Sequence, residues 1–200
     1  MEAEAPIVMA VSWGHGDPKK DSIAVACLDD EGRLREHAMF DNLQEQQMQN
    51  EFYNILKRRR PDLVVFGGFS AQTHRLYDQV RVIARDPDYL ASMNEDDHMR
   101  ERDEDEPISV PVRYIFDEVA RLFQHSKRAE DEFGTLPVLT RYCIGLARYA
   151  QSPLNEYAAL GTDMIAVTFD EEGQHLVWTA SLIRYSVVEC SLFRFQRRSC

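Results

Sequence analysis

Three short runs near the start of the chain constrain its fold most strongly. Residues 7–13 are apolar and strand-forming, residues 22–28 and 33–40 are further strand candidates, and turn-forming residues separate the three runs. The sequence DDEG at residues 29–32 joins the second and third runs, and its glycine suits a turn with positive φ. We therefore predict three successive antiparallel strands, with the first strand in the centre of a sheet.

Helix and strand patterns alternate in the next part of the chain. Leucine, phenylalanine and isoleucine recur at helical spacing over residues 43–59, and Pro61 ends this predicted amphipathic helix. The apolar run at residues 62–67 has no polar alternation, which is typical of a parallel strand covered on both faces. Ser70 then suits the N-cap of a helix that extends to about residue 85.

An acid-rich stretch follows this helix. Residues 86–106 hold ten acidic and two basic side chains, which give −8 of the net charge of −11 and leave −3 for the rest of the chain. The overall charge argues against a surface that binds nucleic acid everywhere through phosphate contacts, although a local basic face is compatible with it. Because residues 86–107 show no hydrophobic period, we predict a mobile, acidic insertion.

The second half of the chain is mainly helical. A strand is predicted at residues 108–116, where Pro111 favours the edge of a sheet. A short extended piece is expected at residues 165–169. Between them, helices are predicted at residues 117–123, 126–133, 136–150 and 152–161. Three antiparallel strands followed by parallel β–α units is the plan of the ribonuclease H-like fold, an α/β mixed sheet with flanking helices.

The strand ends lack most of the acids that metal-dependent nucleases of that fold need. Two-metal chemistry requires several carboxylates at the ends of neighbouring strands. Here the first strand ends near Ser12 and the fourth near Gly68, and neutral groups do not replace anionic ligands of magnesium. Only Asp117 and Glu118, after the fifth strand, keep carboxylates, and Asp117 also suits a helix N-cap. We predict four degenerate site positions and no catalytic residue, metal ligand or cofactor.

Other polar groups suggest binding less strongly. The sequence GHGDPKK at residues 14–20 lacks phosphate-loop spacing and joins two strands, so we expect an ordinary turn. Basic residues at 125–128, together with Arg141 and Arg148, are able to contact phosphate, but solvated helix faces explain them more simply. His74 and Tyr77 are expected at the surface or its boundary.

Cysteine spacing and hydropathy narrow the class of protein further. The four cysteines form no CxxC pair, so we expect incidental thiols in a reducing compartment instead of a disulfide framework or a zinc site. The first residues do not resemble a signal peptide, and no run is long and apolar enough to span a membrane. We therefore expect a soluble, intracellular protein.

Several stretches together resemble one family. They are VSWGHGDPKKD, REHAMFDN, LKRRRPDLVVFGGFSAQTHRLYDQV, DEVARLFQHSKRAEDEF and CIGLARYAQSPLNEYAAL. Over residues 7–177, the chain is similar to the YqgF (ribonuclease H-like) domain of the suppressor-of-Ty-six family of transcription elongation factors and histone chaperones, whose bacterial relative is Tex.

The resemblance implies a domain organisation. A short extension at residues 1–6 precedes the YqgF domain at residues 7–134, and a helical extension at residues 135–176 leads toward a helix-hairpin-helix domain. Residues 177–200 do not match the helix-hairpin-helix part of that family. Because their pattern fits neither a helix nor a strand, we expect an atypical, disordered tail.

The resemblance also implies a function. It predicts a non-catalytic domain, not an enzyme, of a nuclear factor that acts with RNA polymerase II on chromatin. The implied partners are the polymerase elongation complex, histones or nucleosomes, DNA or RNA, and other elongation factors, with no membrane partner. Two alternatives stay open. A metal-dependent nuclease or junction resolvase would need Asp17 or Asp21 to join the acids after the fifth strand, and a histone-binding fragment would use the acids at residues 86–106.

Overall fold

The computed structural model describes residues 5–14, 16–17, 21–68, 70–84 and 110–167. The predicted acidic insertion and the predicted tail lie outside these residues, so both stay predictions. The chain divides into two compact units, Met1–Ala159 and Leu160–Cys200. No helix in the described part is long and apolar enough to cross a membrane.

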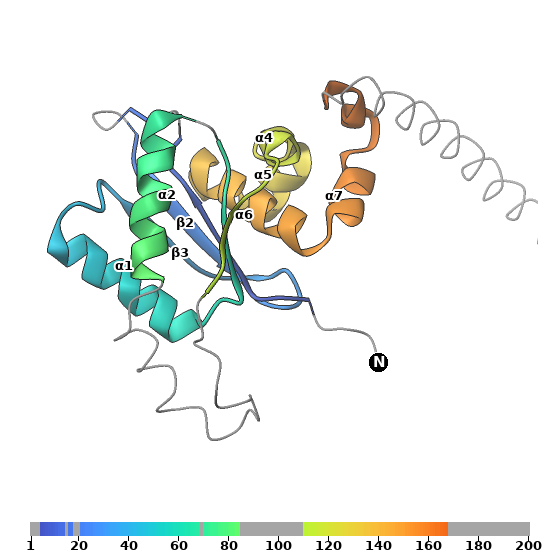
Figure 1. Ribbon diagram of the computed structural model, residues 1–200. Coiled ribbons are helices and arrows are strands. Elements are labelled where there is room, and N and C mark those ends of the chain that lie inside the picture. Colours follow the sequence, from blue (N-terminus) through green and yellow to red (C-terminus); the bar gives the residue numbers. More distant parts are fainter. Residues whose placement is uncertain (1–4, 15, 18–20, 69, 85–109, 168–200) are drawn as a thin grey trace, which may run out of the picture. The chain divides into compact units, whose positions relative to one another are not determined.

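A five-stranded mixed sheet forms the centre of the first unit (Figure 1). Its spatial order is β3 (Leu34–Phe40), β2 (Ile23–Leu28), β1 (Val8–Ser12), β4 (Leu63–Phe66) and β5 (Val112–Tyr114). The pairs β1–β2 and β2–β3 are antiparallel, whereas β1–β4 and β4–β5 are parallel. This arrangement confirms the predicted α/β fold, the central first strand, the interior fourth strand and the edge position of the fifth.

Helices cover both faces of the sheet. The helices are α1 (Gln46–Arg59), α2 (Ala71–Ile83), α4 (Glu118–Phe123), α5 (Lys127–Phe133), α6 (Val138–Gln151) and α7 (Pro153–Leu160). Figure 1 shows α1 and α2 on one side of the strands and α4, α5 and α6 on the other. Met9 and Val11 of β1 belong to the hydrophobic core under α1 and α2. Val8 and Ala10 belong to the second core, under α4, α5 and α6. Every residue of β1 is buried, which explains the unbroken apolar sequence of residues 8–11.

Local side-chain bonds set the ends of several elements. The Ser70 hydroxyl accepts a hydrogen bond from Thr73 N at 3.0 Å, which confirms the predicted cap of α2. Ser126 caps α5 in the same way. In the β2–β3 hairpin, the buried Asp29 accepts bonds from two backbone N–H groups, and Gly32 has a φ of +74°. The predicted turn is thus confirmed.

Two predicted boundaries are wrong. Helix α1 begins at Gln46 and not at residue 43, because Asn42 accepts bonds from the next backbone N–H groups and holds a turn there; Leu43 is buried from this turn. In the second unit, Gly161–Ala166 is a 3-10 helix, so residues 165 and 166 of the piece predicted to be extended at residues 165–169 are helical. Residues 168 and 169 lie outside the described residues. Short apolar runs fit either structure by periodicity alone.

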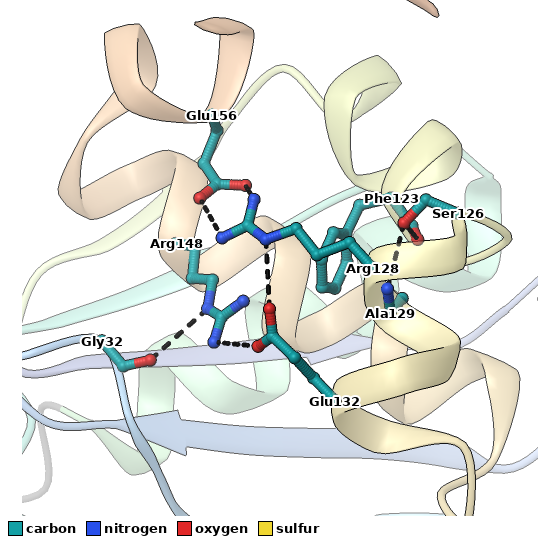
Figure 2. A network of polar contacts seen from close by, with 8 residues as sticks. All are labelled: Gly32, Phe123, Ser126, Arg128, Ala129, Glu132, Arg148 and Glu156. Carbon is teal, nitrogen blue, oxygen red and sulfur yellow. Dashed lines mark hydrogen bonds and ion pairs between the residues drawn. The ribbon is translucent and has the colours of Figure 1, made fainter. Parts of the chain in front are cut away.

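A network of ion pairs joins α5, α6 and α7 (Figure 2). Glu132 of α5 accepts bonds from Arg128 at 3.1 Å and Arg148 at 2.7 Å, and Arg128 also binds both carboxylate oxygens of Glu156 on α7. We call these four residues the α5–α7 network. The Arg148 side chain is only 15% exposed, so the prediction of a solvated face is wrong at this position. Its guanidinium lies 5.7 Å from the Phe123 ring centroid, which explains its burial.

Candidate functional site

A cleft of about 460 Å³ opens where β1 and β4 end. Three of the predicted site positions line it: Ser12 after β1, Gly68 after β4 and Asp117 after β5. The fourth, Glu118, is not among its lining residues. The remaining walls come from the end of α4, the start of α6 and the β1–β2 loop. We call this feature the strand-end cleft.

Asp117 is the buried acid of the cleft. Its residue is 3% exposed, and its Oδ2 accepts hydrogen bonds from Tyr142 Oη at 2.7 Å and from Arg121 Nε at 2.9 Å. Asp117 occupies the N-cap position of α4, as predicted, but its carboxylate makes no capping bond to the helix backbone, so the expected role of its side chain is wrong. Charge-assisted bonds to Arg121 and the tyrosine hydroxyl satisfy it instead.

The two partners of Asp117 keep their protons. Burial and the adjacent negative charge of Asp117 raise the pKa of Tyr142 far above its usual value. Burial alone lowers the pKa of Arg121, but the hydrogen bond and the charge of Asp117 outweigh it and raise that pKa above the usual value. At neutral pH Tyr142 is therefore a neutral donor and Arg121 a cation.

The end of β4 has no room for a side chain. A Cβ atom added to Gly67 would lie 2.1 Å from Tyr142 Oη and 3.0 Å from Asp117 Cβ. Real Cβ atoms do not approach other atoms at the shorter distance. Gly68 has a φ of +86°, which favours glycine as well. Tyr142 thus occupies the space that a carboxylate at Gly67 would need.

The other cleft walls are partly polar. Ser12 is 2% exposed and lies at the end of β1. Asp21 comes from the β1–β2 loop, where its Oδ2 accepts a bond from Asp17 N at 3.0 Å and its carbonyl accepts one from Trp13 Nε1. Of the two additional acids considered for a nuclease, only Asp21 lines the cleft.

The described residues contain no group of three or more His, Cys, Asp or Glu side chains placed to hold a metal ion. Cys27 and Cys143 are buried and free, as the prediction of incidental thiols requires, and burial raises the pKa of Cys27 to about 12. Cys190 and Cys200 lie outside the described part. His74 is exposed and Tyr77 is partly buried, as predicted.

Sequence reasoning missed two groups that shape the site. Arg121 follows Asp117 by four residues, and this i,i+4 spacing of opposite charges on a helix is a signal that was available. Tyr142 contacts Asp117 from 25 residues away, and no local pattern announces that contact. In the structure Tyr142 lies among the buried residues of α6.

Comparisons with known proteins assign the family. A family model described as YqgF, "Holliday-junction resolvase-like of SPT6", matches residues 2–161. The chain is 41% identical over 191 residues to the transcription elongation factor SPT6 of Mycosarcoma maydis, with 84% of this chain and 11% of that protein covered. It is 38% identical over 172 residues to spt-6 of Neurospora crassa, with 86% and 12% covered.

A third relative gives the same result. The chain is 36% identical over 180 residues to spt6 of Schizosaccharomyces pombe, and the match covers 90% of this chain and 12% of the relative. The chain therefore spans only about an eighth of the length of these elongation factors. The family model covers the mixed sheet and the strand-end cleft. The chain belongs to the YqgF family, in its Holliday-junction resolvase-like form found in SPT6 transcription elongation factors.

Proposed function

We propose that this chain is a non-catalytic YqgF domain that acts as a scaffold within a nuclear transcription elongation factor. One observation carries the non-catalytic part. The buried carboxylate of Asp117 is held by Tyr142 and Arg121, while Ser12 and Gly68 supply no acid at the neighbouring strand ends. A two-metal site needs several free carboxylates around the same point.

The elongation part of the proposal rests on the relatives. They are named transcription elongation factors, and they match most of this chain. We infer that the parent protein acts with RNA polymerase II on chromatin in the nucleus, contacts histones, nucleic acid and other elongation factors, and serves as a histone chaperone. We also propose that the YqgF domain comprises residues 7–134. In this proposal a helical extension at residues 135–176 leads toward a helix-hairpin-helix domain.

A nuclease or junction resolvase is the less favoured function. It would have to recruit Asp21, which lines the cleft, and release Asp117 from its two partners. The cost of releasing Asp117 is high because its buried charge would lose both a cationic and a hydroxyl donor. Glu118 is near in sequence but does not line the cleft.

A cleavage assay tests the proposal. Duplex, branched and single-stranded DNA and RNA are incubated with the folded chain and Mg²⁺ or Mn²⁺, beside a variant that carries Asp117→Ala and Glu118→Ala. We expect no metal-dependent cleavage by either protein. Metal-dependent cleavage that is lost in the variant would overturn the non-catalytic function. Circular dichroism spectra of both proteins establish that each is folded.

Histone binding has a separate test. The stretch at residues 86–106 carries a net charge of −8, which favours a basic partner. Deletion of this stretch is expected to weaken the binding of purified histones, and its effect should diminish as salt concentration rises. An unchanged histone affinity would exclude the acidic stretch as the binding segment.

A further inference from the structure

We propose that the outer edge of β3 binds an extended, acidic segment of a partner protein as an additional β-strand. The part of the strand that takes up the partner is residues 36–40, which we call the β3 edge. In this proposal the partner backbone pairs with the β3 edge, and a carboxylate near its middle meets the cations around Glu36. The proposal goes beyond the proposed function and does not depend on it, because none of residues 36–40 lines the strand-end cleft.

The β3 edge offers backbone hydrogen-bonding groups. β3 is the outermost strand of the described sheet and pairs there with β2 alone. In an antiparallel pair, alternate residues turn their N–H and C=O groups away from the partner strand. Within the part of the chain that the structure describes, no strand or side chain bonds to the outward groups of residues 36–40. An edge of this kind is the template to which extended peptides add in strand recognition.

The opposite edge of the sheet is less suited to strand addition. β5 has only three residues, and the Tyr77 hydroxyl donates to the Val112 carbonyl of that strand at 3.1 Å. β3 has seven residues. Its pairing register with β2 shifts between Cys27 and Leu28, so regular pairing covers residues 36–40. Because short strands and bulges are common protections of sheet edges, the regular part of β3 is the less protected of the two edges.

Exposed cations with a buried acidic partner make the surface beside the β3 edge positive. Nε and Nη2 of Arg58 and Nε of Arg59 donate to the Glu36 carboxylate. The Arg58 side chain is 57% exposed, whereas the Glu36 side chain is 17% exposed. Two guanidinium charges therefore oppose one carboxylate, and the cations lie on the solvent side. A carboxylate on an added strand would meet this excess positive charge, as opposite charges do on neighbouring strands.

The distribution of charge favours a peptide over nucleic acid. Exposed acids flank the β3 edge at both ends, Glu31 in the hairpin turn and Asp41 directly after the strand. A nucleic acid strand carries a phosphate for each nucleotide, so a strand along this edge would meet both acids. A peptide is able to place its acids beside Arg58 and an apolar side chain beside Met39, which is 43% exposed. Its backbone also matches the spacing of the β3 edge.

The acidic stretch of this chain is a rival occupant. Residues 86–106 come between α2 and β5 in the sequence, and β5 is the edge strand opposite β3. The full width of the five-stranded sheet, about 19 Å, separates these two strands. We therefore assign the β3 edge to a separate protein chain, and the experiment includes a variant without residues 86–106.

The experiment is a titration of the ¹⁵N-labelled full chain followed by NMR. The probe is a heptapeptide with blocked ends in which valine and glutamate alternate and threonine stands at each end. We expect saturable shifts in the amide signals of residues 36–40. Hydrogen–deuterium exchange should slow at every second amide of this stretch, because only the outward N–H groups gain a partner. The same peptide with N-methylated valine and glutamate residues should not bind, since it lacks the donors that pair with β3.

Charge variants test the side-chain part of the proposal. A peptide with lysine in place of glutamate should bind the natural chain about tenfold more weakly. His37 is exposed and lies opposite Ala26 of β2. His37→Glu should weaken binding of the glutamate peptide about fivefold and strengthen binding of the lysine peptide, which also shows that the variant is folded.

An arginine on each edge strand provides the matched comparison. Arg58→Gln removes a cation beside the β3 edge and should weaken binding of the glutamate peptide about threefold. Arg113→Gln removes an exposed cation from β5, at the opposite edge of the sheet, and should leave binding unchanged. Equal weakening in both variants would indicate attraction by overall charge and would overturn the assignment to the β3 edge.

The other contrary results are equally definite. The absence of saturable shifts, shifts without alternate exchange protection, or binding of the N-methylated peptide would overturn strand addition. Binding that appears only after deletion of residues 86–106 would assign the β3 edge to the acids of this chain. A short oligothymidine that shifts the same amides at lower concentration than the peptide would assign the surface to phosphate. The cleavage assay is independent of all these outcomes, so a failure here is distinguishable from a failure of the non-catalytic function.

Discussion

The strand-end cleft and the α5–α7 network contain the same residue types, carboxylates and arginines, in different arrangements. In the network, the carboxylate of Glu132 joins two arginines, and Arg128 also pairs with both oxygens of Glu156. Two cations and two anions are thus paired with one another, although Nη1 of Arg148 is buried without a hydrogen-bond partner among the described residues. In the cleft, Asp117 is satisfied by Arg121 and Tyr142, but the outer edge of Arg121 faces an open volume.

This difference separates a structural ion-pair cluster from a candidate site. Both clusters contain buried carboxylates and arginines, so neither burial nor ion pairing alone distinguishes them. The cleft differs because the 58% exposed side chain of Arg121 and an exposed apolar residue, Val138, line the same volume. The comparison leads to variants that lower stability by different means. In the cleft the cause is a steric clash, and in the α5–α7 network it is the loss of a charged partner.

The largest effect is expected at Gly67, where the cleft cluster depends on close approach. Gly67→Ala places a Cβ atom 2.1 Å from Tyr142 Oη, and overpacking of this kind costs about 3 kcal/mol of unfolding free energy. Urea denaturation measures the loss. The double variant Gly67→Ala with Tyr142→Phe should cost less than the sum of its two single changes, because the clashing oxygen is gone. If the losses of the two single variants add strictly in the double variant, the Tyr142 hydroxyl is not the cause of the destabilisation by Gly67→Ala.

The next effect is expected at Glu132, where the network depends on charge. Glu132→Ala leaves the mostly buried guanidinium of Arg148 without its carboxylate, which should cost about 1.5 kcal/mol after allowance for the partial exposure of Glu132. Asp131→Ala, an exposed acid on the same helix, is the matched control and should change stability only slightly. Equal losses in both variants would indicate a general effect of helix charge.

A smaller effect is expected at Tyr142. Tyr142→Phe removes the 2.7 Å bond to Asp117 but leaves the bond from Arg121, so we expect a loss of about 1 kcal/mol in urea denaturation. The same variant should remain free of metal-dependent nuclease activity, because one released oxygen of Asp117 does not complete a metal site. Mg²⁺-dependent cleavage gained by this variant would mean that Tyr142 alone suppresses an otherwise complete site.

The smallest effect is a pH dependence in the network. Burial alone raises the pKa of Glu132, but hydrogen bonds and charges from Arg148 and Arg128 outweigh it and lower that pKa. A lowered pKa in the folded state means that the stabilisation is present above the ordinary value of about 4.3 and is lost as the pH falls through the folded value. The stability advantage of the natural chain over Glu132→Gln should therefore shrink below about pH 4.

The size of this pH effect is limited by solvent. Because the Glu132 side chain is 37% exposed, a change of a few tenths of a kcal/mol is expected. Denaturation curves at pH 7, 5 and 3.5 measure it, and Asp131→Asn provides the control. A difference between Glu132→Gln and the natural chain that stays constant with pH would contradict the role assigned to the ionised carboxylate.

The sheet was predictable because each strand carries its own signal. The unbroken apolar sequence of β1 indicates burial on both faces, and the turn at residues 29–32 indicates antiparallel pairing with its neighbours. Ser70 likewise indicates the start of α2 through a local cap. These features depend on residues a few positions apart, so a single sequence contains them.

The site was only partly predictable because its contacts join distant segments. Ser12, Gly68 and Asp117 each follow or end a predicted strand, and parallel strands end at one edge of a sheet. The sequence therefore predicted that the three residues lie together, and all three line the cleft. The role of Asp117 was not predictable, because the bond from Tyr142 arrives from another helix and displaces the expected cap. The burial of Arg148 depends in the same way on long-range contacts with Gly32 and Phe123.

The most direct test of the central claim measures metal binding at the cleft itself. Mn²⁺ is added to the ¹⁵N-labelled chain, and the line widths of the amide signals of Ser12, Gly68 and Asp117 are compared with those of residues on α1. If the carboxylate of Asp117 is engaged by its partners and no acid stands at the other strand ends, we expect no selective broadening at the cleft. Selective broadening there at low Mn²⁺ concentration, reversed by EDTA, would contradict the account and indicate a functional metal site.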